Sequence, residues 1–208
     1  SLMGPGAVDI LGIDSSTLPL YGIGQVSIQD VLLPIIRTDT LGTISYDLLT
    51  TASQSQKVWD ALVQAGAVAV GEEALEMIRV EQGVPSYGRD MGEDYNPLEV
   101  GLNSSISFVK GCYIGQEVVL RLNTYKKVQK HLMGISFEED SPAIATRLEV
   151  EGKNVGFLTS VVDSPLLGHA LALGYVRTSH AEIGQEVNAR IGDKLTRGKM
   201  VELPLEKA

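Results

Sequence analysis

The segment that divides this 208-residue chain into two kinds of structure is Arg79-Val80-Glu81-Gln82-Gly83-Val84-Pro85-Ser86-Tyr87-Gly88. Upstream, the hydrophobic spacing predicts a helix over 72–81, and Gly83 followed by Pro85 is typical of a helix end. Downstream, from residue 84 to 111, the chain is rich in Gly, Pro, Asp and Asn, which predicts loops around small elements. Because loops on a rigid scaffold often carry function, this region is a candidate for the functional site.

Strands and helices alternate on the N-terminal side of this segment. The pattern predicts a short helix over 5–12 and strands over 31–36 and 46–51. A second helix is expected to be capped by Ser53 and to end at Gly66. Its apolar face should pack on the sheet through Val58, Trp59, Leu62 and Val63. Alternation of this kind implies an α/β or α+β domain.

After about residue 127 the hydrophobic period changes to two, which is typical of strands. The pattern predicts a hairpin turn at 151–154, and the regular spacing suggests a small antiparallel barrel or sandwich. We therefore predict an α+β chain with a first domain over 1–127 and a barrel domain over 128–208. The predicted strands of the second domain cover 132–137, 148–150, 155–161, 170–176, 186–191 and 199–203.

The charge balance argues against a broad nucleic-acid surface. The chain has a formal charge of -9, whereas a surface that grips a phosphate backbone needs clustered Lys and Arg. One basic run is interpreted as a solvated face, so direct nucleic-acid binding is not expected. This run comprises Arg121, Lys126, Lys127, Lys130 and His131.

Cysteine usage and hydropathy indicate the compartment. Cys112 is the one cysteine, which excludes an intramolecular disulfide and a multi-cysteine zinc or iron–sulfur site within one chain. No apolar stretch approaches the roughly 20 residues that span a bilayer, and no secretory signal is recognised. We therefore expect no membrane segment and a cytoplasmic or organelle-matrix location. Residues 1–3, Ser-Leu-Met, resemble a remnant of an expression vector, or the start of a chain that begins part-way through a larger protein.

The only cysteine lies between two glycines in Lys110-Gly111-Cys112-Tyr113-Ile114-Gly115-Gln116-Glu117, directly before a helix predicted over about 115–122. A helix N-terminus and Lys110 would both favour the thiolate, and the glycines allow close approach of a ligand or partner. A lone cysteine is also commonly a small buried hydrophobe. Composition alone leaves both interpretations of Cys112 open.

Other chemistries find less support in the sequence. The three histidines assemble no nucleophilic triad, and neither a phosphate-binding Gly-rich loop nor paired metal-ligating histidines are present, so no metal site is expected. Carboxylates are a better lead, because a carboxylate matches the adjacent N–H donors of an amidine-like edge such as that of a pterin. Those that flank Gly- and Pro-rich turns are Glu81, Asp90, Glu99 and Glu117.

Three ordered motifs resemble the aminomethyltransferase family of the glycine cleavage system and its YgfZ-type branch. Residues 79–88 resemble the R-x-E-x-G-x-P-x-x-G segment of the family, and 96–102 its P-x-E-x-G-L segment. Residues 110–117 are similar to the K-G-C-Y-x-G-Q-E motif of the YgfZ-type branch, and Thr159-Ser160 belongs to a weaker match. The resemblance covers essentially the whole chain but begins part-way into the family's usual length. It implies a partial aminomethyltransferase-like folate-binding domain followed by a small antiparallel β-barrel.

The resemblance also implies roles for individual residues. In the family a glutamate matching Glu81 holds the pterin of tetrahydrofolate, so the expected cofactor-binding residues are Glu81, Arg79, Tyr87 and Lys110. Cys112 is the expected catalytic thiol. The expected motif residues are Lys110, Gly111, Cys112, Tyr113, Gly115, Gln116, Glu117 and Arg121.

The function implied by the YgfZ-type branch is folate-dependent assembly or repair of iron–sulfur clusters, with an indirect effect on tRNA modification. Its partners would be iron–sulfur proteins or assembly factors, to which Cys112 could offer one ligand or from which it could accept sulfur as a persulfide. The alternative is an aminomethyltransferase, although the family's catalytic aspartate lies in the portion that is missing here. A structural fragment without the ligand channel is a third interpretation. The sequence also departs from the branch after Arg121, where it has Tyr125-Lys126-Lys127 instead of an Arg-Gly pair.

Overall fold

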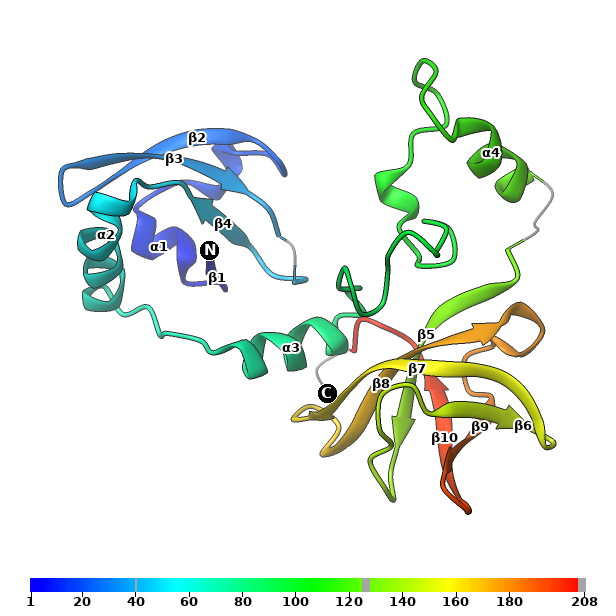
Figure 1. Ribbon diagram of the computed structural model, residues 1–208. Coiled ribbons are helices and arrows are strands. Elements are labelled where there is room, and N and C mark those ends of the chain that lie inside the picture. Colours follow the sequence, from blue (N-terminus) through cyan, green and yellow to red (C-terminus); the bar gives the residue numbers. More distant parts are fainter. Residues whose placement is uncertain (40, 125–127, 206–208) are drawn as a thin grey trace. The chain divides into compact units, whose positions relative to one another are not determined.

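The computed structural model describes residues 1–39, 41–124 and 128–205. It forms two compact units, Ser1–Leu75 and Glu76–Ala208, and the boundary between them falls within helix α3 (Glu72–Glu81). Figure 1 shows helices with a small sheet in the first unit and a β-barrel in the second, which confirms the predicted α+β class. The predicted domain boundary at 127/128 lies outside the described residues and stays a prediction.

The first unit is a four-stranded antiparallel sheet in the order β1-β4-β3-β2, with helices on one face. The buried core joins Ala7 and Leu11 of the first helix and Val58 of the second to Leu33 and Ile35 of the sheet. The elements are β1 (Leu2–Met3), α1 (Ala7–Leu11), the 3-10 helix η1 (Ser15–Thr17), β2 (Ile23–Ile28), β3 (Val31–Arg37), β4 (Ser45–Leu48) and α2 (Ala52–Gln64).

Two strands of this sheet were absent from the sequence-based prediction. Strand β2 pairs with β3 through a hairpin whose central residues, Gln29 and Asp30, have φ values of 44° and 67°. These left-handed conformations are usually supplied by glycine or asparagine, so the turn carries a weak sequence signal. Strand β1 pairs Leu2 with Tyr46, and Leu2 is buried. The segment interpreted as a vector remnant is therefore part of the sheet.

Helix α2 packs on the sheet as predicted, but its cap and its inward face differ. The helix begins at Ala52 with Thr51 as its N-cap residue, and no side chain caps it, so the prediction for Ser53 is wrong. Val58 and Ala61 are buried, whereas Trp59 is 54% and Val63 47% exposed. Successive helical residues are about 100° apart, so the sheet covers only a narrow stripe of the helix.

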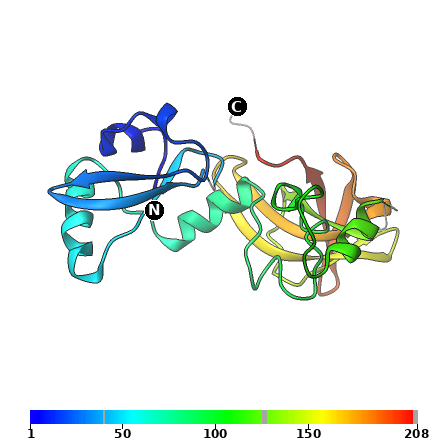
Figure 2. The ribbon, with the colours of Figure 1, turned by 90° about the horizontal axis from the view of Figure 1, so that it is seen from above.

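The second unit is a closed six-stranded antiparallel barrel with a loop-rich segment and two helices attached (Figures 1 and 2). The strand order is β10-β5-β8-β7-β6-β9, and the β9–β10 pairing closes it. The strands are β5 (Lys130–Phe137), β6 (Arg147–Val150), β7 (Lys153–Ser164), β8 (His169–Arg177), β9 (Glu186–Ile191) and β10 (Lys194–Val201). Helix α4 (Gln116–Thr124) and the 3-10 helices η2 (Asn103–Ser105) and η3 (Thr178–His180) complete the unit.

The period-two stretches of the sequence form this barrel, so the prediction of an antiparallel barrel is confirmed. Alternate side chains of each strand point inward, among them Ile135, Phe137, Leu158 and Ala172, all at most 1% exposed. Close backbone approach is built in at Gly156, where a Cβ atom would lie 1.8 Å from the carbonyl oxygen of Tyr175 on the neighbouring strand.

Helix α3 docks on the outside of the barrel through its last turn. Val80 is fully buried in a cluster with Val162 of β7 and with Leu171 and Leu173 of β8. The residues on either side of it in the helix, Arg79 and Glu81, are buried as well. The C-terminal turn of α3 is therefore fixed against two barrel strands.

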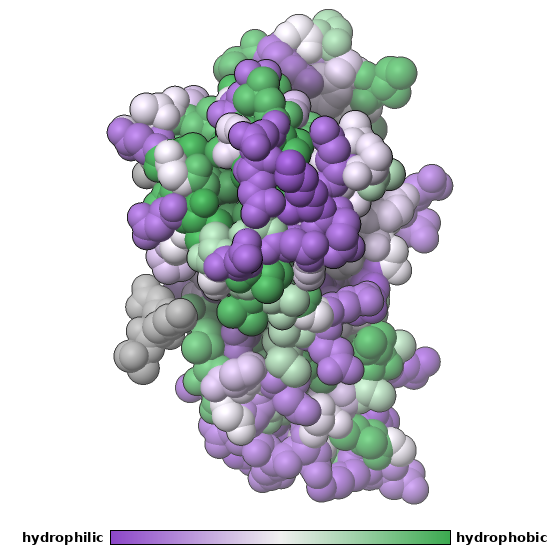
Figure 3. Space-filling view, turned by 90° about the vertical axis from the view of Figure 1, so that its left-hand side faces the viewer, coloured by the Kyte–Doolittle hydropathy of each residue, from purple (hydrophilic) through white to green (hydrophobic). Residues whose placement is uncertain are grey.

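Helix α4 contrasts with α3, because it contains no buried residue. Its predicted apolar face is only partly covered, and Val118 is 57% exposed. In the described ranges no helix combines the length and the apolar character needed to cross a membrane. On the face shown in Figure 3, hydrophobic and hydrophilic residues are interspersed.

Candidate functional site

The candidate site begins at the last turn of α3, where two charged side chains reach the barrel on either side of Val80. Arg79 is 8% and Glu81 is 6% exposed, which is unusual for charged residues unless they are paired. Both make hydrogen bonds to β7 or to the turn that follows it. The first of the three motifs therefore joins helix to barrel.

All five N–H donors of the Arg79 guanidinium are bonded. Nε and one Nη2 hydrogen go to the two oxygens of Glu76, at 2.7 and 2.5 Å, and Nη2 also donates to Ser160 at 2.6 Å. Nη1 donates to the carbonyl of Val84 at 3.0 Å and to Asp90 at 2.7 Å. No donor of Arg79 remains for a ligand.

Asp90 is the partner around which the loop after α3 is arranged. Its carboxylate is fully buried and accepts four hydrogen bonds, from Arg79, from Thr159 and Ser160 of β7, and from the N–H of Ser86. Its backbone carbonyl accepts a fifth from the hydroxyl of Tyr175 at 2.7 Å. A buried carboxylate with this many donors is satisfied, so Asp90 holds the loop in place rather than offering acceptors to a ligand.

The pairing of Arg79 with Glu76 changes the pKa of both side chains. Burial disfavours the Arg79 cation, but hydrogen bonds and charges of Glu76 and Asp90 outweigh burial and raise the pKa of Arg79. The hydrogen bond from Arg79 lowers the pKa of the Glu76 carboxyl, against a smaller opposing effect of burial, and Arg89 adds to the lowering. Both shifts favour the charged forms of Arg79 and Glu76.

Glu81 has a different environment from Asp90. Its Oε1 accepts one hydrogen bond from the hydroxyl of Ser164 at 2.5 Å and another from the N–H of Leu166 at 3.1 Å. Its backbone carbonyl accepts from the N–H of Leu205 at 2.9 Å. Among the described residues, none donates to Oε2. The side chain is therefore held at one oxygen and keeps acceptor capacity at the other.

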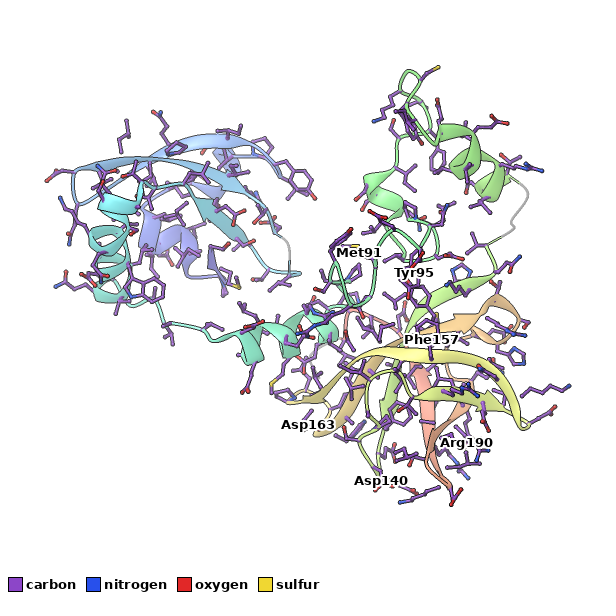
Figure 4. All side chains as sticks on the ribbon, in the orientation of Figure 1. Met91, Tyr95, Asp140, Phe157, Asp163 and Arg190 are labelled. Atoms are coloured by element: carbon purple, nitrogen blue, oxygen red, sulfur yellow. The ribbon has the colours of Figure 1, made fainter. Side chains whose placement is uncertain are left out.

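Tyr87 and Met91 lie in the loop that Asp90 anchors. Tyr87 is 71% exposed, so its ring is accessible, and its backbone forms an isolated bridge with Met91. Figure 4 shows Met91 on this loop above the barrel. The three expected cofactor-binding residues of the first motif thus differ. All donors of Arg79 are hydrogen-bonded, Glu81 accepts hydrogen bonds at one of its two carboxylate oxygens, and the ring of Tyr87 is exposed.

A tyrosine stack fixes the next part of the segment. The ring centres of Tyr95 and Tyr175 lie 4.6 Å apart and the rings are parallel within 2°, and the ring centre of Phe157 lies 5.7 Å from that of Tyr175. Figure 4 shows Tyr95 on the loop segment and Phe157 on the barrel. The Lys130 ammonium lies 4.5 Å from the first ring and 4.8 Å from the second, a cation–π arrangement. Burial raises the pKa of both tyrosines, with nearby carboxylates adding to it.

A cavity of about 340 Å³ lies where the first two motifs meet the barrel. The first motif contributes Gln82, Gly83 and Pro85, and the second contributes Val100 to Leu102. Its size is at the lower end of that of small-molecule sites in proteins. The barrel and the C-terminal strand complete the lining with Leu132, Met133, Gly134, Leu173, Ile183, Val201, Glu202 and Leu203.

The cysteine motif forms a separate, exposed loop ahead of α4. Cys112 is exposed, which rejects the buried-hydrophobe interpretation, as are Gly111, Glu117 and Arg121, whereas Gln116 is half-buried. The Lys110 ammonium lies 4.9 Å from the centre of the Tyr113 ring, so a described contact directs it to that ring. Gly115 has a φ of 88° and makes the turn into the helix.

The structure therefore groups the predicted site residues in two places. Arg79 and Glu81 are on the barrel side of α3, and the cysteine motif is on the loop before α4, which lies apart from α3 in Figures 1 and 2. The described residues show no hydrogen bond between the two groups. Within the basic run, Lys126 and Lys127 are outside the described residues, and so is Tyr125.

Several residues of the site escaped the sequence-based reasoning. Thr159 and Ser160 carried only the signal of a weaker family match, which did not assign them a role, and their partners Arg79 and Asp90 are about seventy to eighty residues away in the chain. Ser164 and the tyrosine stack carried no signal. The described residues contain no group of three or more His, Cys, Asp or Glu side chains that could hold a metal ion.

The fold and the site define a class: an α+β protein in which a helix and the loop-rich segment after it are fixed on a closed antiparallel barrel, and the last residue of the helix, Glu81, keeps one carboxylate oxygen without a donor among the described residues. The model of the GCVT N-terminal domain matches residues 1–110, and that of the glycine cleavage T-protein C-terminal barrel domain matches residues 130–207. The chain therefore belongs to the glycine-cleavage T-protein family.

Relatives and a solved structure agree with this assignment. A putative chloroplastic transferase of Arabidopsis thaliana is 35% identical over 76% of this chain and 36% of its own length. An aminomethyltransferase of Listeria welshimeri is 29% identical over the whole chain, which spans 59% of that relative. The crystal structure of the glycine cleavage system aminomethyltransferase T from Bartonella henselae has the same fold, with a TM-score of 0.85 and 22% identity over 98% of this chain and 58% of that one.

Proposed function

We propose that this chain is a tetrahydrofolate-binding protein of the YgfZ type, acting in the assembly or repair of iron–sulfur clusters with an indirect effect on tRNA modification. The observation that carries the proposal is the pairing of two features in one unit. Glu81 keeps a free carboxylate oxygen at the barrel, and Cys112 is exposed within the K-G-C-Y-x-G-Q-E motif. Its partners would be iron–sulfur proteins or their assembly factors.

The residues present fit a pterin in donor and acceptor chemistry. The pterin edge carries adjacent N–H donors, and Glu81 offers Oε2, a carboxylate oxygen that accepts no hydrogen bond from a described residue. Tyr87 presents an accessible ring for packing. Arg79 has no free donor, so its part would be to hold α3 and Asp90 in position. Lys110 would contribute to cofactor binding from the loop that carries Cys112.

The proposed role of Cys112 is to contribute one thiolate ligand in a transient complex with a partner, since one cysteine does not hold a cluster alone. Its exposure makes it accessible to such a partner. We expect Cys112→Ser to fold normally and to fail to complement a deletion strain in cluster-dependent activity, with Gly71→Ala, which lies outside the motif and where a Cβ meets no atom within 4 Å, as the control. Full complementation by Cys112→Ser would refute the thiol role.

The folate part of the proposal is tested by calorimetric titration with tetrahydrofolate. This chain and the protein encoded by the full-length gene are each titrated beside their Glu81→Ala variants. Loss of a charge-assisted hydrogen bond predicts that Glu81→Ala weakens binding roughly 100-fold. If neither protein binds, or if Glu81→Ala binds as tightly as the unaltered chain, the folate proposal is wrong.

A second candidate is an aminomethyltransferase that moves a one-carbon unit to tetrahydrofolate, because several relatives carry that name. An assay for tetrahydrofolate-dependent release of ammonia from an aminomethyl donor, run with Cys112→Ser, separates the two candidates. Activity that survives this substitution favours the transferase.

For the location we propose the cytoplasm or an organelle matrix, and the chloroplastic relative lends support to the latter.

A further inference from the structure

The turn between β7 and β8 makes an unusual contact with Glu81. Ser164, the last residue of β7, is 2% exposed and pairs with His169 across the hairpin. The turn between them is closed by a hydrogen bond from the N–H of Gly168 to the carbonyl of Ser164 at 2.8 Å, and Gly168 has a φ of 74°. The turn is thus a rigid part of the barrel rather than a loose connection.

The Ser164 hydroxyl is oriented from both sides. It accepts a hydrogen bond from the N–H of Leu167 at 3.2 Å and donates its own hydrogen to Glu81 Oε1 at 2.5 Å. The N–H of Leu166 donates to the same carboxylate oxygen. Two donors from one turn therefore converge on Oε1, and the carboxylate is left with Oε2 as its unused acceptor.

We infer that Ser164 is a positioning residue for ligand binding: it fixes the Glu81 side chain so that Oε2 is presented to the N–H donors of a bound pterin. This inference rests on the proposed folate function and adds a residue to it that none of the three motifs contains. The hydroxyl reaches the ligand only through Glu81. A fixed acceptor loses less side-chain freedom on binding, so positioning raises affinity without a new contact.

Substitutions at Ser164 separate positioning from mere packing. Ser164→Ala removes the donor and should weaken tetrahydrofolate binding roughly tenfold, as expected for one hydrogen bond to a charged group. Ser164→Thr keeps the hydroxyl and should restore near-normal affinity. Ser164→Cys keeps the volume but is a weak donor, and should give an intermediate loss if the alanine variant is unstable. In a Glu81→Ala background, Ser164→Ala should cause no further loss.

Ser136→Ala is the matched control. Ser136 is also a buried barrel serine, and its hydroxyl lies 3.3 Å from Nε2 of His169 rather than near Glu81. It should leave folate affinity unchanged. All variants are compared by calorimetric titration with tetrahydrofolate and by thermal unfolding without ligand, which reports any change in stability by itself.

The outcomes distinguish this inference from the proposed function. A tenfold loss in Ser164→Ala, rescued by Ser164→Thr and absent in Ser136→Ala, supports positioning. If Glu81→Ala weakens binding but Ser164→Ala does not, or if Ser164→Ala weakens it equally without Glu81, the positioning role is wrong and the folate site stands. Absence of binding by the unaltered protein overturns both.

Discussion

At the scale of single residues, two buried carboxylates of the described residues, Asp90 and Glu81, differ in how many hydrogen bonds they accept. Asp90 accepts four hydrogen bonds at its carboxylate, whereas Glu81 accepts two at one oxygen. Both were candidates for a pterin ligand on sequence grounds. The geometry leaves only Glu81 with acceptor capacity for that role.

We predict that Asp90→Ala is strongly destabilising, because it leaves the buried Arg79 cation without one of its two carboxylate partners. Removing one member of a buried pair costs about 3–5 kcal/mol of the free energy of unfolding. Urea unfolding followed by circular dichroism measures the change. The matched control is Asp163→Ala, an exposed aspartate of β7 labelled in Figure 4, which should change stability by less than about 0.5 kcal/mol. Equal effects of the two substitutions would contradict the role of Asp90.

The ion pair between Glu76 and Arg79 should make the folded protein less stable at acid pH. Chiefly through its hydrogen bond with Arg79, the folded-state pKa of Glu76 lies below its ordinary value of 4.5. Stability from this pair is therefore complete above that value and is lost as pH falls through the lower folded pKa. Unfolding in urea between pH 7 and pH 3 should show a smaller loss for Glu76→Gln than for the unaltered chain. Parallel curves would refute this assignment.

At the scale of elements, local sequence patterns predicted those helices and strands whose formation depends mainly on neighbouring residues in the chain. The barrel strands followed from period two, and α3 followed from helical spacing with Gly83 and Pro85 beyond its end. The hairpin at Gln29-Asp30 lacks the glycine that usually marks such a turn, so β2 was missed. The hydrogen bonds between Asp90 and the barrel strands join residues that are 69 to 85 positions apart, and no local pattern reports such pairings.

The close approach of β7 and β8 predicts a large effect of substitution at Gly156. In Gly156→Ala the added Cβ would overlap the carbonyl oxygen of Tyr175, which is backbone and has no room to move without breaking the β7–β8 pairing. We expect a loss of at least about 3 kcal/mol in the free energy of unfolding, or an insoluble protein. Gly92→Ala, where a Cβ meets no atom within 4 Å, should differ little from the unaltered chain. A stable Gly156→Ala protein would mean that the strands are farther apart than described.

At the scale of the whole molecule, the two units have separate hydrophobic cores. We therefore predict two transitions in scanning calorimetry, of which Gly156→Ala lowers only one. If the folate proposal holds, tetrahydrofolate at 100 times its dissociation constant should stabilise that same transition by about 2.7 kcal/mol. A single cooperative transition would show that the units unfold together, and stabilisation of the other transition would place the ligand away from Glu81.

Because all five donors of Arg79 are hydrogen-bonded within the protein, this arginine is a poor sequence marker of ligand binding in the family. Lysine has three donors at one point and does not reproduce a planar fork that reaches Glu76, Asp90, Ser160 and the Val84 carbonyl together. The position thus selects for arginine on architectural grounds alone. A search pattern that starts with this arginine will retrieve chains that dock a helix on a barrel. If the folate proposal holds, the chains that bind the ligand are distinguished by the carboxylate two positions later and not by the arginine.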